Sequence, residues 1–296
     1  MRTSGALLLK SSAKHAIRRV LPLSFRKQLA IWISDQKWIR PDRRAWWSIQ
    51  ILQDLTEIDI NEYHKFLWSN HLAYAGSYEV PMRFGSEKMK QSRQIFFQDL
   101  KKHLIGLGID PKSGVQSVFE VGCSSGYQLR YLETDIFTEA KELEGLDIDR
   151  HAVENGSNYL RRIGSKAQLK CGDIENLDRA IGSKIYDVMI CTGVLMYLRE
   201  DSAARVVDAM MRHSGRMVAI AGLAYPDFDN ALLEHSVVRD DDRSFIHNID
   251  AMATWAGGTV VGRSWEGARL VDGHTIYFVF VKKHAHGNED GVIQVE

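Results

Sequence analysis

The sequence has few cysteines and no long apolar run. Its 296 residues include 3 cysteines, Cys123, Cys171 and Cys191, which are isolated from one another. Without a Cys-x-x-Cys pair we expect no structural zinc or other metal site and no disulfide framework, and a reducing compartment is the simpler expectation. No stretch of about 18 apolar residues occurs, so a transmembrane helix is not expected. The sequence therefore predicts a cytoplasmic protein, with the option of peripheral membrane attachment described next.

Net charge is also lacking, but the charges are unevenly distributed. Lys+Arg and Asp+Glu both number 38, while residues 1–47 hold eleven basic and two acidic residues, a charge of +9 that leaves −9 on the remainder. A basic head indicates a partner for the head itself. Its Trp32, Trp38, Trp46 and Trp47 lie among Lys and Arg, which suits an anionic membrane surface. Docking onto a partner protein or onto the chain's own body is the alternative, and the acid-free start also resembles an organelle transit peptide.

Residues 1–112 lack strand alternation and predict a helical N-terminal region. Apolar residues recur at helical spacing near 24–39, 43–55, 60–75 and 87–107. We divide the region into the basic head, 1–47, and a substrate cover, 48–112. The cover contains an aromatic and histidine band that could wall a pocket, although such residues at helical spacing commonly form a core. The band consists of Tyr63, His64, Trp68, His71, Tyr74 and Tyr78, and Arg83 and Phe84 follow as candidate cofactor contacts.

Residues 113–284 predict an α/β domain. Candidate strands are 117–121, 142–146, 167–170, 186–191, 216–221, 259–264 and 275–282, and candidate helices are 127–133, 151–163, 201–212 and 248–256. Strands that alternate with helices indicate a parallel sheet covered on both faces. The last two strands are separated only by a turn-rich stretch at 266–273, so we expect an antiparallel hairpin at the end of a seven-stranded, mostly parallel sheet. Residues 285–296 form a tail.

The strongest signal for a ligand site is Val-Phe-Glu-Val-Gly-Cys-Ser-Ser-Gly at residues 118–126. A buried strand carries an acid near its end, and a small-residue loop then opens a helix at Tyr127. Small residues let a ligand approach the backbone, and the helix N-terminus offers free N–H groups. The dinucleotide fingerprint fails, because Ser124 and Tyr127 occupy its second and third glycine positions. The acid also suits a cationic amino acid tail better than a pyrophosphate, and a plain strand–helix turn is the alternative.

Three further segments place polar or small residues after successive strands. Asp147 follows the second strand and could accept hydrogen bonds from both hydroxyls of a ribose, while Asp149 could cap the next helix. Asp173 and Ile174 follow the third strand, where they could bind an exocyclic amine and cover an adenine face, unless they form a simple turn. A small-residue loop at 192–194 follows the fourth strand.

These four segments, in this order and spacing, resemble the class I (Rossmann-like) S-adenosylmethionine (SAM)-dependent methyltransferases over about residues 90–283. The resemblance implies SAM as the cofactor and a loop for its methionine end, formed by Glu120, Gly122, Cys123, Ser124 and Gly126. It further implies that Asp147 and Ile148 contact ribose and adenine, that Asp173 and Ile174 clamp adenine, and that the backbone of Cys191 contacts the methionine end. Many members have glycine where this chain has Ser124.

The acceptor is expected to be a small molecule or a glycan or lipid precursor, methylated on oxygen or nitrogen. Nucleic acid is an unlikely acceptor, because residues 191–194 replace the Asn- or Asp-Pro-Pro-aromatic loop of amino-methylating enzymes and the acidic body is a poor surface for phosphates. An aminopropyl-type transferase on the same fold and a non-catalytic SAM-binding scaffold are the alternatives. A nicotinamide oxidoreductase would require the missing glycines.

Methyl transfer from a sulfonium depends mainly on alignment, and a general base is needed only if the acceptor must lose a proton early. Candidate bases are His247 and His235, in the segment 225–250 that is expected to overhang the cofactor. Both histidines could instead pair locally, and the acidic run 240–242 could be a solvated loop. Nothing in the sequence predicts an oligomeric state.

Overall fold

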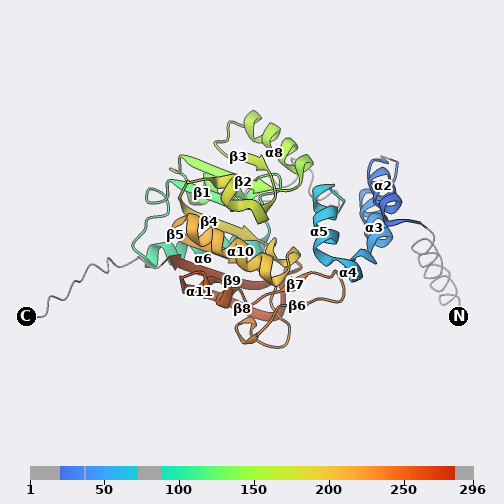
Figure 1. Ribbon diagram of the computed structural model, residues 1–296. Helices are drawn as coiled ribbons and strands as arrows, with labels where there is room; N and C mark the ends of the chain where they lie inside the picture. Colours follow the sequence, from blue (N-terminus) through green and yellow to red (C-terminus); the bar gives the residue numbers. More distant parts are fainter. Residues whose placement is uncertain (1–20, 37, 73–88, 284–296) are drawn as a thin grey trace, which may run out of the picture.

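The fold is built around one seven-stranded sheet. The computed structural model describes residues 21–36, 38–72 and 89–283, and Figure 1 shows their arrangement. The strands are β1 (Ser117–Val121), β2 (Glu142–Asp147), β3 (Gln168–Cys171), β4 (Tyr186–Thr192), β5 (Ser214–Ala221), β8 (Gly258–Val271) and β9 (His274–Lys283). They lie in the order β3-β2-β1-β4-β5-β9-β8. The first five are parallel, and β9 pairs antiparallel with both β5 and β8. The predicted mostly parallel sheet with a terminal hairpin is confirmed.

Helices cover both faces of the sheet. One face carries α6 (Gln91–Gly106), α7 (Tyr127–Tyr131), which continues as the π-helix η3 (Leu132–Ile136), and α8 (Arg150–Arg162). The other carries α9 (Leu177–Ile181), α10 (Glu200–His213) and α11 (Ile249–Trp255). Along β4, Val188 and Ile190 join the first core while Met189 and Cys191 join the second. Because successive side chains of a strand point to opposite faces, this apolar run is buried on both sides.

The structure contains short elements that the sequence pattern did not predict. These are α9, the two-stranded ribbon β6 (Val237–Val238) and β7 (Phe245–Ile246), and the 3₁₀ turns η4 (Ile174–Asn176), η5 (Leu195–Tyr197) and η6 (Asn230–Leu232). Elements of two to five residues are too short to show periodicity. The expected turn at 266–273 is also shorter, since β8 runs on to Val271. Only Asp272 and Gly273, with φ of 52° and 76°, form the turn.

The N-terminal helices form a smaller unit beside the sheet. They are α2 (Leu23–Ser34), α3 (Pro41–Leu52), α4 (Leu55–Ile58) and α5 (Ile60–Ser69). Leu52, Leu55 and Leu67 belong to their shared core, and Figure 1 shows α5 between the sheet and the α2–α3 pair. By contrast, α6 buries Phe96 and Leu100 in the core of the sheet. The expected boundary at residue 112 assigns α6 to the N-terminal region. In the structure α6 packs against the sheet instead.

Candidate active site

Two small-residue loops meet at the carboxyl edge of the sheet, between β1 and β4. The strand order reverses there, because β2 lies on one side of β1 and β4 on the other, and such a switch point opens a crevice in an α/β sheet. Gly122 has a φ of 78° and Ser124 a φ of 50°. A Cβ atom at Gly122 would lie only 2.2 Å from Cγ2 of Val194. Glycine thus permits the close approach of the loops after β1 and β4.

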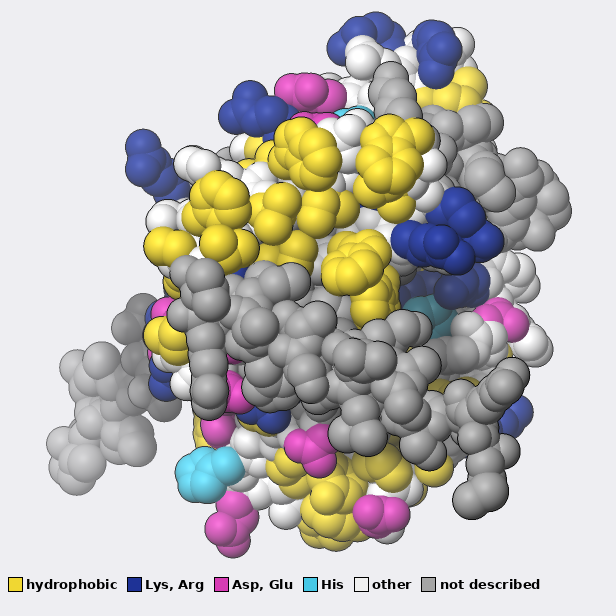
Figure 2. Space-filling view, turned by 90° about the vertical axis from the view of Figure 1, so that its right-hand side faces the viewer, with side chains coloured by type: hydrophobic (Ala, Val, Ile, Leu, Met, Phe, Trp, Pro, Cys, Tyr) yellow, Lys and Arg dark blue, Asp and Glu magenta, His cyan; other side chains and the backbone are white. Residues whose placement is uncertain are grey.

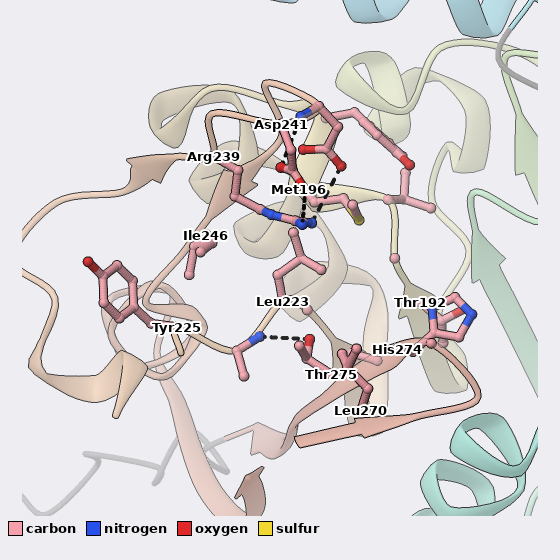
Figure 3. Close-up of a pocket in the computed structure, with 18 of the residues that line it drawn as sticks. Thr192, Met196, Leu223, Tyr225, Arg239, Asp241, Ile246, Leu270, His274 and Thr275 are labelled. Carbon is pink, nitrogen blue, oxygen red and sulfur yellow. Dashed lines mark hydrogen bonds and ion pairs between the residues drawn. The ribbon is translucent and has the colours of Figure 1, made fainter. Parts of the chain in front are cut away.

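The crevice is a cavity of about 860 Å³, within the size range of small-molecule sites, about 300–1,000 Å³. Some of the lining residues lie at or just after the carboxyl ends of β1, β2 and β4. They include Gly122, Ser124, Asp147 and Thr192. Another part comes from β8, β9 and the segment after β5, including Tyr225, Asp227, Arg239, Ile246 and His274. In Figure 3, Tyr225 and Ile246 lie on the opposite side of the pocket from Thr192 and His274. The cavity therefore joins the predicted cofactor loop to the segment expected to overhang it.

Asp147, at the end of β2, is hydrogen-bonded to the loop that follows β1. Its Oδ2 accepts a hydrogen bond from the Ser124 N–H at 2.7 Å, and its Oδ1 accepts one from the Asp149 N–H at 2.9 Å. Burial raises the pKa of Asp147 to about 6, although these donors oppose the shift. A carboxylate has about four acceptor positions, so these backbone donors leave capacity for a ligand. Asp149 caps α8 by accepting from the Ala152 N–H at 2.9 Å, as the sequence predicted.

Glu120 is fully buried on β1, behind the cavity wall. Its Oε1 accepts a hydrogen bond from Nε2 of Gln128 at 2.8 Å, and Gln128 also bonds to the Thr192 hydroxyl. Within the described chain Oε2 has no hydrogen-bond partner. Burial, reinforced by the charge of Asp147, raises the pKa of Glu120 well above its usual value. Gln128 and Thr192 line the cavity, whereas Glu120 does not, so Gln128 stands between the buried carboxyl and a ligand.

Arg93 of α6 also lines this cavity, and the sequence analysis did not identify it. Its Nη2 lies 3.0 Å from the position that a Cβ of Gly193 would occupy, so the guanidinium sits at the loop after β4. Its positive charge partly opposes the upward pKa shift of Glu120. The site thus presents both an acid and a cation, which suits the ammonium and carboxylate of an amino acid tail. Arg83 and Phe84, the expected contacts, lie outside the described residues.

A smaller cavity of about 70 Å³ adjoins Asp147. Its apolar lining includes Ile148, Ile174 and Val194, with Asp173 at the margin. Asp173 accepts a hydrogen bond from the Glu175 N–H at 3.0 Å and forms an ion pair with Lys65 of α5. This hydrogen-bonded ion pair raises the pKa of Lys65. The residues expected to bind adenosine, Asp147, Ile148, Asp173 and Ile174, therefore line one cavity.

Helix α5 closes this smaller cavity. Besides Lys65, it contributes Asn61, His64 and Trp68 to the lining. The His64 ring lies 2.9 Å from the carbonyl oxygen of Arg243, and Asn61 Oδ1 accepts from the Arg199 N–H at 3.0 Å. The N-terminal unit is therefore hydrogen-bonded to segments at the carboxyl edge of the sheet.

The aromatic and histidine band is divided between several places. Trp68 lies in both cavities and its ring is 4.7 Å from that of Tyr197. Tyr63 is instead buried in the core of the N-terminal helices. His71 Nδ1 contacts Asp149 Oδ2 at 2.5 Å. Tyr74 and Tyr78 lie outside the described residues.

Some expected cofactor residues support the site from behind. Cys123 and Cys191 are fully buried thiols with raised pKa values, that of Cys191 to about 12, chiefly because of burial. Neither lines the cavity, and nor does Gly126, which begins α7 with a φ of 77°. Because β4 extends to Thr192, that residue is the first after Cys191 to line the cavity, and the loop itself starts at Gly193.

The structure places neither candidate base in the cavity. His247 is buried, with Nδ1 2.7 Å from the Ser236 hydroxyl and Nε2 2.9 Å from the Leu195 carbonyl oxygen, and burial lowers its pKa. His235 is 86% exposed and lies 3.7 Å from Glu200. Both arrangements match the alternative of local pairing and argue against a role as base. The acidic run 240–242 is exposed, as expected of a solvated loop, and it also contributes to the cavity lining, where Arg239 pairs with Asp241 at 2.6 Å (Figure 3).

The chain is similar to several solved structures at low sequence identity. Magnesium protoporphyrin IX methyltransferase from Synechocystis PCC 6803, with bound SAM, is 15% identical, with 65% of this chain and 80% of that one covered and a TM-score of 0.48. The 1,6-didemethyltoxoflavin-N1-methyltransferase from Burkholderia thailandensis is 12% identical, with 66% and 80% covered and a TM-score of 0.49. An S-adenosylmethionine-dependent methyltransferase from Clostridium acetobutylicum ATCC 824 is 13% identical, with 65% and 92% covered and a TM-score of 0.48.

Sequence comparison gives a family for the central part of the chain. No curated protein matches the sequence, but residues 118–215 match the family described as a methyltransferase domain. The matched segment contains Glu120, Asp147 and Asp173, the three acids at the ends of β1, β2 and β3. The match identifies residues 118–215 as a methyltransferase domain, and the sheet order and the paired cavities agree with the class I (Rossmann-like) SAM-dependent type that the sequence predicted.

Proposed function

We propose that this chain transfers the methyl group of SAM to an oxygen or nitrogen atom of a small molecule or of a glycan or lipid precursor. The supporting observation is the continuity of the larger cavity, which reaches from Ser124 and Asp147 to Tyr225 and Arg239. A cofactor at one part of this cavity and an acceptor at the other would share one enclosure. Its volume of about 860 Å³ suits small ligands.

The residues on the cofactor side have separate tasks in this proposal. Bound SAM supplies a methyl group on a sulfonium, which is already a good leaving group. Arg93 pairs with the carboxylate of the methionine end, and Gln128, oriented by its hydrogen bond to the buried Glu120, faces the ammonium. Asp147 accepts from the ribose hydroxyls while holding the Ser124 N–H at 2.7 Å. Fixing the cofactor at both ends aligns the methyl group with the acceptor, and alignment provides much of the rate enhancement.

The acceptor side combines aromatic, acidic and basic groups. Tyr225, Asp227 and His274 are titratable side chains in the lining, so a proton released by a hydroxyl acceptor has nearby groups to receive it. Arg239 offsets part of the charge of Asp241 and Asp242, at 2.6 and 3.4 Å. A cavity lined by this many carboxylates is unfavourable for nucleic acid phosphates. Recognition of a small polar acceptor is the better match.

The proposal is tested by identifying the product made from SAM. Purified chain, SAM and a panel of small hydroxyl, amine and glycan or lipid-precursor acceptors are incubated, and the products are separated by mass spectrometry. A methylated acceptor with one equivalent of S-adenosylhomocysteine supports the proposal. Release of methylthioadenosine would instead indicate transfer of the aminocarboxypropyl group of SAM, a reaction of the aminopropyl type. Tight SAM binding with no product from any acceptor would favour a non-catalytic scaffold. Asp227→Asn is expected to change the acceptor's KM while leaving SAM affinity nearly unchanged.

A further inference from the structure

The α2–α3 pair presents a set of exposed aromatic rings. Phe25 and Trp32 of α2 are 50% and 55% exposed, Trp38 between the helices is 78% exposed, and Trp46 and Trp47 of α3 are each 43% exposed. We refer to these five residues as the aromatic surface. Large aromatic side chains usually contribute to cores, and their gathering on a surface marks an interaction site.

The inner faces of the two helices are already used. Ala30 of α2 and Leu52 of α3 are fully buried in the core of the N-terminal unit. Phe25 and Trp32 are two turns apart on α2, so they lie on the same outward side. Trp46 and Trp47 are in edge-to-face contact, with ring centroids 5.1 Å apart. The outward rings are therefore additional to the contacts that hold the helices together.

Basic residues accompany the aromatic surface. Arg43 is exposed and precedes Trp46 and Trp47 by three and four residues, which places it on their side of α3. Arg40 is exposed close to Trp38. Figure 2 shows large hydrophobic side chains across the upper half of this face, with Lys and Arg side chains around them. Residues 1–47 as a whole carry eleven basic and two acidic residues, so this end of the chain complements a negatively charged partner.

We propose that the aromatic surface docks the chain onto the surface of an anionic lipid bilayer. Indole rings favour the headgroup region of a membrane, and each nearby Lys or Arg adds attraction to anionic lipids. Among the residues that the structure describes, no helix is long and apolar enough to cross a membrane, so attachment would be at the interface. Separate projecting rings with cations among them suit insertion between headgroups.

Docking in this way would also orient the catalytic cavity. The core of the N-terminal unit includes Leu52 of α3 and Leu67 of α5, and α5 carries Trp68 into the cavity wall. In Figure 1 the α2–α3 pair lies beyond α5, on the same side of the sheet as the strand ends that bear the site. A bilayer bound by α2 and α3 would therefore face the side of the molecule that carries the carboxyl edge of the sheet. Membrane binding itself does not depend on the proposed methyl transfer.

The test is co-sedimentation of the full chain with vesicles. Vesicles of phosphatidylcholine alone are compared with vesicles containing about one third phosphatidylserine. We expect binding to the anionic vesicles only, and weaker binding as NaCl rises from about 50 to about 500 mM, because salt screens the attraction. The Trp32→Ser, Trp38→Ser double variant is expected to lose affinity by about tenfold or more, since binding scales with the apolar area inserted. Trp255→Ser is the control, because Trp255 of α11 is 75% exposed outside the aromatic surface.

A charge variant tests the electrostatic part separately. Arg43→Glu should weaken binding to anionic vesicles several-fold, whereas Arg161→Glu on the exposed side of α8 should change it much less. Circular dichroism and the melting temperature establish that each variant is folded. Absence of binding at low salt would overturn the proposal, as would equal binding by the tryptophan double variant and Trp255→Ser. Self-association in light scattering that the double variant abolishes, without vesicle binding, would assign the aromatic surface to contact between copies of the chain.

Discussion

Lys65 of α5 forms an ion pair with Asp173 at the end of β3, across the margin of the smaller cavity. The two residues come from the N-terminal unit and from the sheet, and the pair joins them where adenine is expected to bind. Lys65 also lies 3.8 Å from Glu175. Helix α5 is thus both a wall of the smaller cavity and a link between the two parts of the structure.

Replacing Lys65 by alanine should loosen this wall with little effect on folding. The Lys65 side chain is 47% exposed, and half-exposed ion pairs contribute only about 0–1 kcal/mol to the free energy of unfolding. We expect a small drop in melting temperature and a several-fold faster dissociation of SAM in stopped-flow measurements. Lys27→Ala is the matched control, because Lys27 pairs with Glu62 of the same helix and lies outside both cavities. Equal dissociation rates for the two variants would show that the Lys65 pair does not retain the cofactor.

Glu120→Gln should change the pH dependence of stability and weaken SAM binding. The pKa of Glu120 is raised in the folded chain, so above the ordinary carboxyl pKa the folded state holds more protons than the unfolded state. The free energy of unfolding of the SAM-free chain therefore decreases as pH rises through that range. We expect Glu120→Gln to reduce this decrease, measured as melting temperature between pH 5 and pH 8, and to weaken SAM binding about tenfold or more. Glu139→Gln, at an exposed site, serves as control and should do neither.

The raised pKa of Asp147 predicts how the affinity for SAM varies with pH. Its pKa is raised to about 6, and only the ionised carboxylate can accept hydrogen bonds from both ribose hydroxyls. Between pH 7.5 and pH 5 the ionised fraction falls about tenfold, so the dissociation constant of SAM should increase by about that factor. Titrations in that range provide the measurement. Asp147→Asn should bind weakly with a flatter pH profile, and an affinity of the intact chain that stays constant over this range would exclude the assigned role.

Gly122→Ala should disrupt the contact between the loops after β1 and β4. The added Cβ would meet Val194 at 2.2 Å, at a φ of 78°. We expect a loss of more than about 2 kcal/mol in the free energy of unfolding, together with loss of SAM binding. Gly164→Ala isolates the backbone effect, because Gly164 has a φ of 67° with no heavy atom within 4 Å of the added Cβ. That control should lose about 1 kcal/mol and keep its SAM affinity. Chemical denaturation and titration measure both quantities.

The fold was largely predictable because apolar runs alternate with helical segments throughout the second half of the chain. The observed β1 matches the expected 117–121, and β4 exceeds the expected 186–191 by one residue. A strand buried on both faces gives a strong signal of this kind. The ribbon of β6 and β7 and the short α9 gave no comparable signal. The long β8 was underestimated because its second half, with Gly267 and exposed Leu270, reads as a turn.

The site was only partly predictable, since the tertiary arrangement decides which side chains reach a cavity. Gly122 follows β1, Asp147 ends β2 and Asp173 lies two residues after β3, and strand ends are fixed by the sheet. Arg93 and Gln128 lie on helices, where only the packing of α6 and α7 against the sheet brings them to the cavity. The position of His247 depends equally on packing, which buries the ring and engages both of its nitrogens.

Isothermal titration of the intact chain with SAM, beside the Asp147→Ala variant, tests the central claim most directly. We expect the intact chain to bind SAM with one site per chain and the variant to bind at least tenfold more weakly. Trp255→Ser, altered far from the cavities, should bind like the intact chain. Absence of SAM binding by the intact chain, or equal binding by Asp147→Ala, would contradict the assignment of this cavity as the cofactor site.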